Sequence, residues 1–546
     1  MDRLPQPKWF PLLAAFAGMA LSPAPLRAEE KPLRQLLDAE VRAVWQSKKI
    51  VPAGRADDAA FLRRIYLDLA GTIPRLDETR QFLKDTAPDK RTKLIDRLLE
   101  DPRFASHMAD IWQPLLIGRN PAHPELQQHH SVLHKWLTDK FAKNEPYDRW
   151  VRELLQGEGN SPENGPPLFY IQFNGRAEET AVAVSRIFLG TQIQCAQCHD
   201  HPLDKWTQLD FYGMAGFFAR LGVADGGVVQ GKRRLVIAEK STGEVLFTGP
   251  VAQQKPGKKG TPVPPRFLGG DALEEPPLPK DFKEPKVKAG QAPPQPLFSR
   301  KEKLVAWLTA ADNPYFARAI ANRLWGRFMG RGLFHPVDNL QDNRPAAIPQ
   351  LFEALHEALV RHQFDLKWFI HELVNSETYQ LSIGNGSGTE WYAQRRLRPL
   401  SAEEMLAVLR EATGFDAAAR VSGKPGDAKL PFLLVHSVLR ECGEPMDGRG
   451  EFQGSLSERL LVNNSSDLRQ LIRRRKGNLT DTLLSSTAPW EERVEQLYLT
   501  VLSRPPRDEE RKRFVEHLTS DPKNPEPLVE EAIWVLLSCG EFRFNH

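Results

Sequence analysis

The sequence has few features of the common enzyme classes and little that suits a nucleic acid. It contains no nucleophile elbow, phosphate-binding loop, H-E-x-x-H pair or EF-hand loop, which weighs against the common hydrolases and nucleotide enzymes. Its 74 basic and 70 acidic residues leave a net charge of 74 − 70 = +4, without the aromatic-basic interleaving of a nucleic-acid groove. The dense basic run Arg473–Lys476 is more typical of a solvated helix end. We therefore expect no nucleic-acid partner.

Long apolar stretches are also missing. The apolar stretch 9–21 has 13 residues, fewer than the roughly 20 that a membrane-spanning helix needs. Basic residues precede this stretch and Ala28 offers a small-residue cleavage site, which is the pattern of a secretory signal peptide. We expect residues 1–28 to be removed and the mature chain to begin between Pro25 and Lys31. The mature protein should then be periplasmic or extracellular, without a membrane span.

The composition is that of a globular protein, and the length exceeds one ordinary core. The chain has 546 residues, of which 41% are hydrophobic and 26% are charged. Apolar residues recur at helical spacing through most of the sequence, which predicts a mainly α fold. The predicted domains are helical at 29–221 and helical at 300–546, with a β-hairpin insert and linker at 222–299.

Strand-like patterns concentrate in the predicted insert. Leu235–Ala238 and Glu244–Phe247 flank Ser241–Gly243, which predicts a β-hairpin. The following stretch, Pro250–Pro296, is rich in proline, glycine and lysine. It predicts an extended connection with little regular structure.

Several helix ends are marked by capping residues. Asp57 precedes a helical apolar pattern that Gly71 ends, and Asp101 precedes a proline at a first helical turn. Ser401 with Glu404 three residues later fits a capping box. These signals predict where individual helices begin.

Half of the 4 cysteines lie in one short motif. Cys195, Cys198 and His199 form the pattern C-x-x-C-H, which is the attachment pattern of a c-type haem. Two thiols at this spacing can reach the two vinyl groups of one porphyrin, and the histidine can ligate the iron. We therefore predict one covalent haem c, in an irregular segment between two helices. Met214 is the nearest downstream methionine, although the helical pattern around it favours a core position.

The same motif leaves two alternatives open. His201 follows two residues after His199, so zinc or iron could bind to the two cysteines with one or both histidines. In an oxidising compartment Cys195 and Cys198 could instead form a disulfide. Cys442 could likewise pair with the remaining cysteine or stay as a free buried thiol.

Longer runs of the sequence resemble a known family. Phe61–Pro74 and Gln194–Trp206 resemble the domain of unknown function 1549, found in exported proteins that are abundant in planctomycetes. Asn313–Trp325 and Gly330–Asp338 resemble its companion, the domain of unknown function 1553, and Glu541–His546 resembles the end of that companion. The resemblance covers nearly all of the mature chain. It implies no activity, but relatives often carry an added cytochrome c or lectin-like domain, which implies redox work or carbohydrate surroundings.

Three hypotheses on function follow from these observations. The first is an exported redox protein with one c-type haem, which acts with an unknown redox partner or exported substrate. The second is a metalloprotein, such as a hydrolase, that uses the same cysteines and histidines, and the third is a binding or scaffold protein without catalysis. A second site is also predicted near one polar helix face, as a substrate or interdomain pocket. Its residues are Arg318, Asn322, Trp325, Arg331, His335 and Asp338. Arg323, on the same helix, could equally be a buried structural arginine paired with Asp338.

Overall fold

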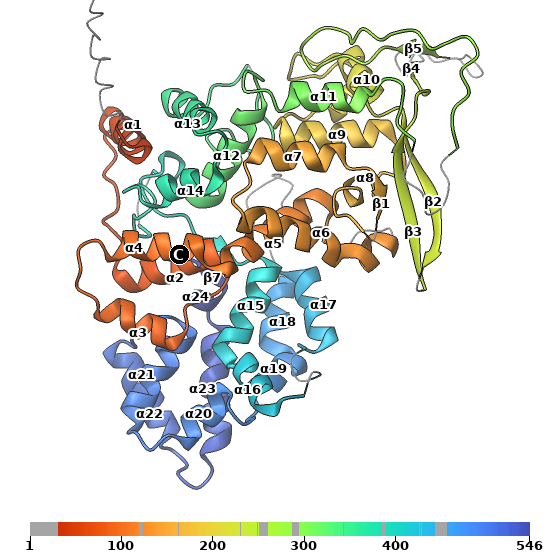
Figure 1. Cartoon of the computed structure of the whole chain (residues 1–546). Coiled ribbons are helices and arrows are strands. Elements are labelled where there is room, and N and C mark those ends of the chain that lie inside the picture. The colour runs from red at the N-terminus through yellow and green to blue at the C-terminus, as the bar shows by residue number, and fades with distance from the viewer. Residues whose placement is uncertain are drawn as a thin grey trace, which may run out of the picture.

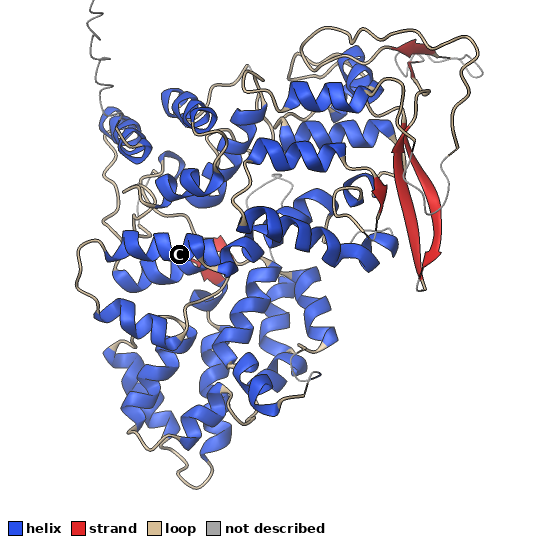
Figure 2. Cartoon of the chain, viewed as in Figure 1, coloured by secondary structure: helices blue, strands red, loops and turns tan. Residues whose placement is uncertain are grey.

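The computed structural model describes most of the chain beyond the N-terminal segment. The described residues are 31–119, 124–161, 163–229, 231–247, 249, 260–286, 294–341, 343–384, 388–424, 426, 429–442 and 456–546. The predicted signal peptide, 1–28, lies outside the described residues. Helices dominate the architecture, as the sequence predicts, and the described strands form small sheets (Figure 2), one of them three-stranded.

The first part of the chain folds as helices that pack around one large core (Figure 1). Their bounds are α1 (Leu33–Lys48), α2 (Asp58–Ala70), α3 (Leu76–Lys84), α4 (Lys90–Glu100), α5 (Pro102–Ile117), α6 (Pro124–Ala142), α7 (Tyr147–Gln156), α8 (Leu168–Ile171), α9 (Ala177–Phe188), η1 (Gln194–Gln197) and α10 (Gln208–Gly216). The next helices join the same core, and they are α11 (Arg300–Leu308), α12 (Phe316–Met329), α13 (Pro349–Arg361), α14 (Leu366–Val374) and η3 (Thr389–Trp391). Helices before and after the predicted 222–299 insert therefore share one core, which extends from Leu33 to Ala393.

A second core holds the C-terminal helices. They are α15 (Ala402–Thr413), α16 (Phe415–Ser422), α17 (Phe432–Glu441), α18 (Leu456–Asn464), α19 (Ser466–Ile472), α20 (Leu479–Ser485), α21 (Trp490–Val501), α22 (Asp508–Leu518), α23 (Pro525–Ser538) and α24 (Gly540–Arg543). Leu67 and Ile73, from α2 and the turn after it, are also part of this core. Figure 1 shows the C-terminal helices in blue below α2 and α5, with the chain end returning to α2. α2 and the end of the chain are therefore packed together.

The helix starts follow the capping signals. Asp57 accepts a hydrogen bond from the backbone N–H of Ala60 at 2.8 Å, and Ser401 forms the predicted capping box with Glu404. Gly71 ends α2 with φ of 67°, a conformation that favours glycine. A Cβ atom at this position would lie 2.3 Å from Nδ1 of His107, so the glycine also makes room for α5.

The predicted hairpin pairing is wrong, although both of its strands exist. The strands are β1 (Gly159–Asn160), β2 (Leu221–Val229), β3 (Lys232–Glu239), β4 (Val245–Phe247), β5 (Thr261–Val263), β6 (Arg398–Pro399) and β7 (Phe544–Asn545). β3 pairs with β2 in the three-stranded sheet, which has the order β1-β3-β2, and β4 pairs with β5 inside the predicted linker. The backbone N–H groups of Ser241 and Thr242 donate to the Glu284 carboxylate at 3.0 and 2.9 Å and do not close a turn between β3 and β4. The sequence pattern did not predict β2, because its glycines interrupt the run of β-branched and aromatic residues that is typical of a strand.

Among the described helices, we find none that is both long and apolar enough to cross a membrane. The basic run Arg473–Lys476 follows the end of α19, as predicted. Nε of Arg474 donates to the Asp481 carboxylate at 2.9 Å, so this run is a solvated helix end.

Candidate functional site

The C-x-x-C-H motif lies in an exposed segment between α9 and α10. Cys195 belongs to the single-turn helix η1, and Cys198 follows directly after it. Both are free thiols exposed to solvent, whereas the intervening Ala196 is fully buried and anchors the turn. The chain thus presents both sulfur atoms on the surface from a turn that is fixed to the core. This is the irregular interhelical context that the sequence predicts.

Hydrogen bonds distinguish the two histidines of the motif. Nδ1 of His199 lies 2.8 Å from the backbone oxygen of Asp200, and a carbonyl oxygen can only accept, so Nδ1 carries the proton. In the neutral ring of His199, the lone pair is then on Nε2. Nδ1 of His201 instead accepts from the backbone N–H of Leu203 at 3.2 Å, so its Nε2 carries the proton. His199 therefore has the tautomer of a metal ligand that donates its other ring N–H to a carbonyl, and His201 has a tautomer that stabilises the turn.

The nearby carboxylates are also engaged in local structure. Asp200 accepts from the backbone N–H of Gln208 at 2.9 Å, at the start of α10, and Asp204 accepts from that of Lys205 at 2.8 Å. Within the described part of the chain, no three or more His, Cys, Asp or Glu side chains are grouped as a metal site. The motif therefore offers its two thiols and Nε2 of His199 as candidate ligand atoms.

Apolar side chains around the motif are mostly in the core. Trp206, Phe211 and Met214 are buried, so Met214 has the core position that its helical pattern favours. Leu203 and Leu209 are instead 66% and 53% exposed, on the same segment as the motif. The surface of the motif segment therefore includes two exposed leucines, whereas its aromatic rings Trp206 and Phe211 belong to the core.

The other two cysteines do not form a disulfide. Cys442 is buried at the end of α17, and Cys539 is half-buried at the end of α23. Burial raises the pKa of Cys442 to about 12, which makes it an unreactive thiol at neutral pH.

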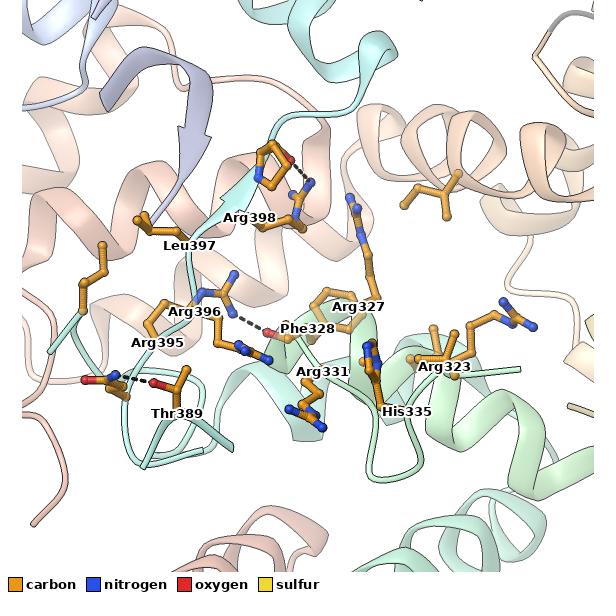
Figure 3. Close-up of a pocket in the computed structure, with 18 of the residues that line it drawn as sticks. Arg323, Arg327, Phe328, Arg331, His335, Thr389, Arg395, Arg396, Leu397 and Arg398 are labelled. Carbon is orange, nitrogen blue, oxygen red and sulfur yellow. Dashed lines mark hydrogen bonds between the residues drawn. The ribbon is translucent and has the colours of Figure 1, made fainter. Parts of the chain in front are cut away.

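A second candidate site is a pocket of about 400 Å³ between α5, α12 and the segment before β6. Its apolar wall includes Met108, Ile111, Trp112 and Leu115 from α5. Its polar lining is dominated by six arginines, namely Arg323, Arg327, Arg331, Arg395, Arg396 and Arg398, together with His335. Figure 3 shows Arg327 on α12 and Arg331 in the segment after it, with residues 395–398 on a neighbouring segment.

Two buried carboxylates hold the inner arginines. Glu404 accepts from Arg327 at 2.6 Å and from Arg398 at 2.7 and 2.9 Å. Asp68, on α2, accepts from Arg395 and Arg398 at 3.1 Å each. Arg395 also donates to the backbone oxygen of Phe328. One buried network thereby connects side chains of α2, α12 and α15 with Arg395 and Arg398.

The network keeps its carboxylates ionised. Burial raises the pKa of Glu404, but the charges of Arg398 and Arg327 outweigh this effect and hold the pKa far below its usual range. The pKa of Asp68 is likewise lowered, because Arg395 and Arg398 outweigh the effect of burial. His107, whose Nε2 lies 3.2 Å from Arg327, is fully buried, and burial lowers its pKa to about 4. At neutral pH, His107 is therefore neutral and the two carboxylates are charged.

The predicted second site is brought together only in part. Arg323, Arg331 and His335 line the pocket, and Arg323 also donates to the backbone oxygens of α9. Arg318 faces another hollow, where it donates to Glu353 at 2.7 Å. The remaining predicted residues are structural. Asn322 bonds to the backbone of residues 334 and 337, Trp325 packs against Tyr392, and Asp338 accepts from Gln192 and Arg186.

Sequence reasoning missed the other half of the pocket. Arg395, Arg396 and Arg398 come from a short segment that carries no helical or strand pattern of its own. Three arginines within four residues were the available signal. In the sequence this cluster looks like the solvated basic run at 473–476. The two runs differ in the fold, where Arg395 and Arg398 pair with the buried carboxylates of Asp68 and Glu404.

The fold and these two sites define a mainly helical protein with an exposed C-x-x-C-H turn and an arginine-lined pocket. Residues 36–222 match the model of a protein family of unknown function (DUF1549), and residues 300–429 match that of a second such family (DUF1553). The chain therefore belongs to the proteins that carry these two domains in this order. The first match contains the C-x-x-C-H turn, and the second contains all six pocket arginines. No curated protein and no solved structure matches the chain.

Proposed function

We propose that the protein is an exported redox protein that carries one c-type haem on Cys195, Cys198 and His199. The supporting observation is the tautomer of His199, whose Nδ1 donates to the Asp200 backbone oxygen and leaves Nε2 as the ligand atom. The two exposed thiols three residues apart supply the attachment points. Electron transfer to a partner, or a haem-dependent reaction on an exported substrate, is the proposed role.

The attachment requires no groups beyond those of the motif and the porphyrin. Each thiol adds across one vinyl group, so that sulfur bonds to one carbon and hydrogen to the other, without an oxidant. His199 would hold the iron through Nε2, because its Nδ1 donates to the Asp200 backbone oxygen. When bound, the haem supplies one-electron chemistry, and its exposed position gives a partner direct access.

Two neighbouring side chains, Met214 and His201, have structural roles that do not favour them as a further ligand of a bound haem. Met214 is fully buried within α10, so it is not placed to ligate from the surface. His201 is engaged in its turn through Nδ1. We therefore expect imidazole to shift the absorption bands of the holoprotein at millimolar concentration. A spectrum that imidazole leaves unchanged would show that the chain supplies a second ligand.

The direct test is to produce the full chain together with haem-maturation machinery. We expect a mass increase of one haem and colour that persists after denaturation, because the linkage is covalent. The variant Cys195→Ala/Cys198→Ala should lose both signals, whereas Cys539→Ala, the matched control outside the motif, should keep them. Colourless protein that contains roughly one zinc or iron per chain would favour the metal alternative. Colourless, metal-free protein with a Cys195–Cys198 disulfide would favour the scaffold alternative.

Export is part of the same proposal. The N-terminal pattern of basic residues, apolar stretch and Ala28 supports a cleaved signal peptide. N-terminal sequencing of secreted material should give a start between Pro25 and Lys31. Secreted material that retains residues 9–21 would contradict cleavage at this place.

A further inference from the structure

We propose that the pocket between α5, α12 and residues 383–399 binds a small organic anion with an apolar body. This site is separate from the C-x-x-C-H turn and does not depend on the proposed haem. The pocket volume of about 400 Å³ is within the range of about 300–1,000 Å³ typical of small-molecule sites. Its lining combines arginine side chains with apolar side chains. The arginines favour an anionic group of the ligand, and the apolar side chains favour an apolar body.

The charge of the lining selects an anion. Six arginines line the pocket, and no Asp or Glu side chain is among the described residues that do so. Behind the lining, Asp68 and Glu404 balance two of the three charges of Arg327, Arg395 and Arg398, which leaves 3 − 2 = +1 for that network. A cation or a neutral sugar would leave this positive charge without compensation. A carboxylate, sulfate or phosphate ester would balance it, and the planar guanidinium matches these groups with paired hydrogen bonds.

The inner arginines are held in place before any ligand arrives. Arg398 forms hydrogen bonds with both Glu404 and Asp68, and Arg395 is held by Asp68 and the Phe328 backbone oxygen. Such side chains lose little further freedom on binding, which favours affinity. Arg331 and Arg396, half-buried and on two different segments, also line the pocket (Figure 3).

The opposite wall selects an apolar body. α5 contributes Ile111, Trp112 and Leu115 to the lining, so the wall facing the arginines includes no charged side chain of that helix. Ile383 and Leu397 also line the pocket, and they are 42% and 55% exposed. Burying these two apolar side chains under a ligand would be favourable. The ligand class is therefore an anion with a ring or an alkyl chain next to its charged group, and inorganic phosphate alone would use only half of the site.

The test uses two probes of nearly the same shape that differ in charge. Anilinonaphthalene sulfonate has an apolar ring system and an anionic group, and N-phenylnaphthylamine has the rings without the charge. Titration calorimetry on the full chain should show one site for the sulfonate, with at least about tenfold weaker binding of the neutral probe, as the loss of a charge-assisted contact implies. Raising the salt concentration should weaken only the sulfonate.

Variants locate the site. Arg331→Gln and Arg396→Gln should each weaken the sulfonate several-fold and leave the neutral probe unchanged. The matched control Arg513→Gln, an exposed arginine on α22, should have no effect. Leu397→Glu adds a carboxylate at an exposed position of the lining and should abolish sulfonate binding, whereas Leu397→Gln should preserve it.

Three outcomes would overturn the proposal. They are equal affinity for the charged and neutral probes, no response of sulfonate binding to Leu397→Glu, and an equal effect of Arg513→Gln and Arg396→Gln. Each would show that the sulfonate binds through rings or general charge elsewhere on the surface. Because Leu397 is exposed, its variants should fold normally, and thermal unfolding of each variant checks that they do.

Discussion

The C-x-x-C-H turn and the arginine network differ in how far apart their interacting residues are in the sequence. Within the motif, hydrogen bonds join near neighbours, such as His199 with Asp200 and Asp200 with Gln208. One bond to the adjoining Leu203 backbone oxygen comes from Asn343, 140 residues away. In the network, Asp68 binds Arg398 across 330 residues and Asn545 across 477. The turn is exposed, and the network is buried where the two cores meet. One region therefore carries reactive groups on a local scaffold, and the other stabilises the fold and lines a pocket.

This difference predicts opposite responses to substitution. Changes in the turn should alter chemistry and leave stability nearly unchanged, because few buried contacts are lost. Changes in the network should destabilise the whole chain, because a buried charge without its partner is costly.

The largest effect is expected for Glu404→Gln. This change removes the charge that Arg327 and Arg398 share, and it should lower the free energy of unfolding by about 3–5 kcal/mol. The neighbouring variant Glu403→Gln is a matched control, because Glu403 forms a bidentate pair with Arg119 nearer the surface. That control should cost at most about 1 kcal/mol. Urea unfolding of both variants measures the two values. An equal loss of unfolding free energy in the two variants would show that burial of the network does not increase the cost of removing its charge.

A somewhat smaller effect is expected from acid. Burial lowers the pKa of His107 to about 4 in the folded chain, below the ordinary value of 6.5. Between these values the unfolded chain binds one more proton than the folded chain, so stability falls as the pH drops from 6.5 to 4. The shift of 6.5 − 4 corresponds to roughly 3 kcal/mol. Below this window, Asp68 and Glu404 continue the loss, because their lowered pKa values stabilise the fold only while they are ionised.

The variant His107→Gln isolates the contribution of the histidine. It should be less stable than the original chain at pH 8 because it loses native packing, but its stability should change less between pH 6.5 and 4. Chemical unfolding at several pH values measures both effects. An unchanged pH dependence in His107→Gln would assign the acid response to other groups.

The sequence predicted the elements that local chemistry specifies. Asp57, Gly71 and Ser401 mark helix ends through bonds or angles within a few residues. The C-x-x-C-H turn was found for the same reason. Its exposed position between α9 and α10 follows from where the two helices end. The proposed haem, the export and the domain boundaries stay predictions.

Properties that depend on distant partners could not be read from the sequence. Leu235–Ala238 forms part of a strand as predicted, but its partner is the glycine-containing β2, because no turn forms between β3 and β4. Arg395 and Arg398 gave no sign of burial, since their carboxylates come from α2 and α15. For the same reason, the helix face with Arg318 and Asn322 was assigned to one pocket, whereas the fold directs these two side chains to different partners.

The smallest effect on stability is expected for His201→Ala. This residue accepts one hydrogen bond from the Leu203 backbone in an exposed segment, so its loss should cost no more than about 1 kcal/mol. Haem attachment should persist, because Cys195, Cys198 and Nε2 of His199 are not altered. The matched variant His199→Ala should change the absorption spectrum of any haem that is attached, since it removes the proposed axial ligand. Haem staining after denaturing electrophoresis, together with absorption spectra, separates the two variants. Loss of a bound metal in His201→Ala, without any haem in the original chain, would mean that His201 gives up its place in the turn to act as a ligand.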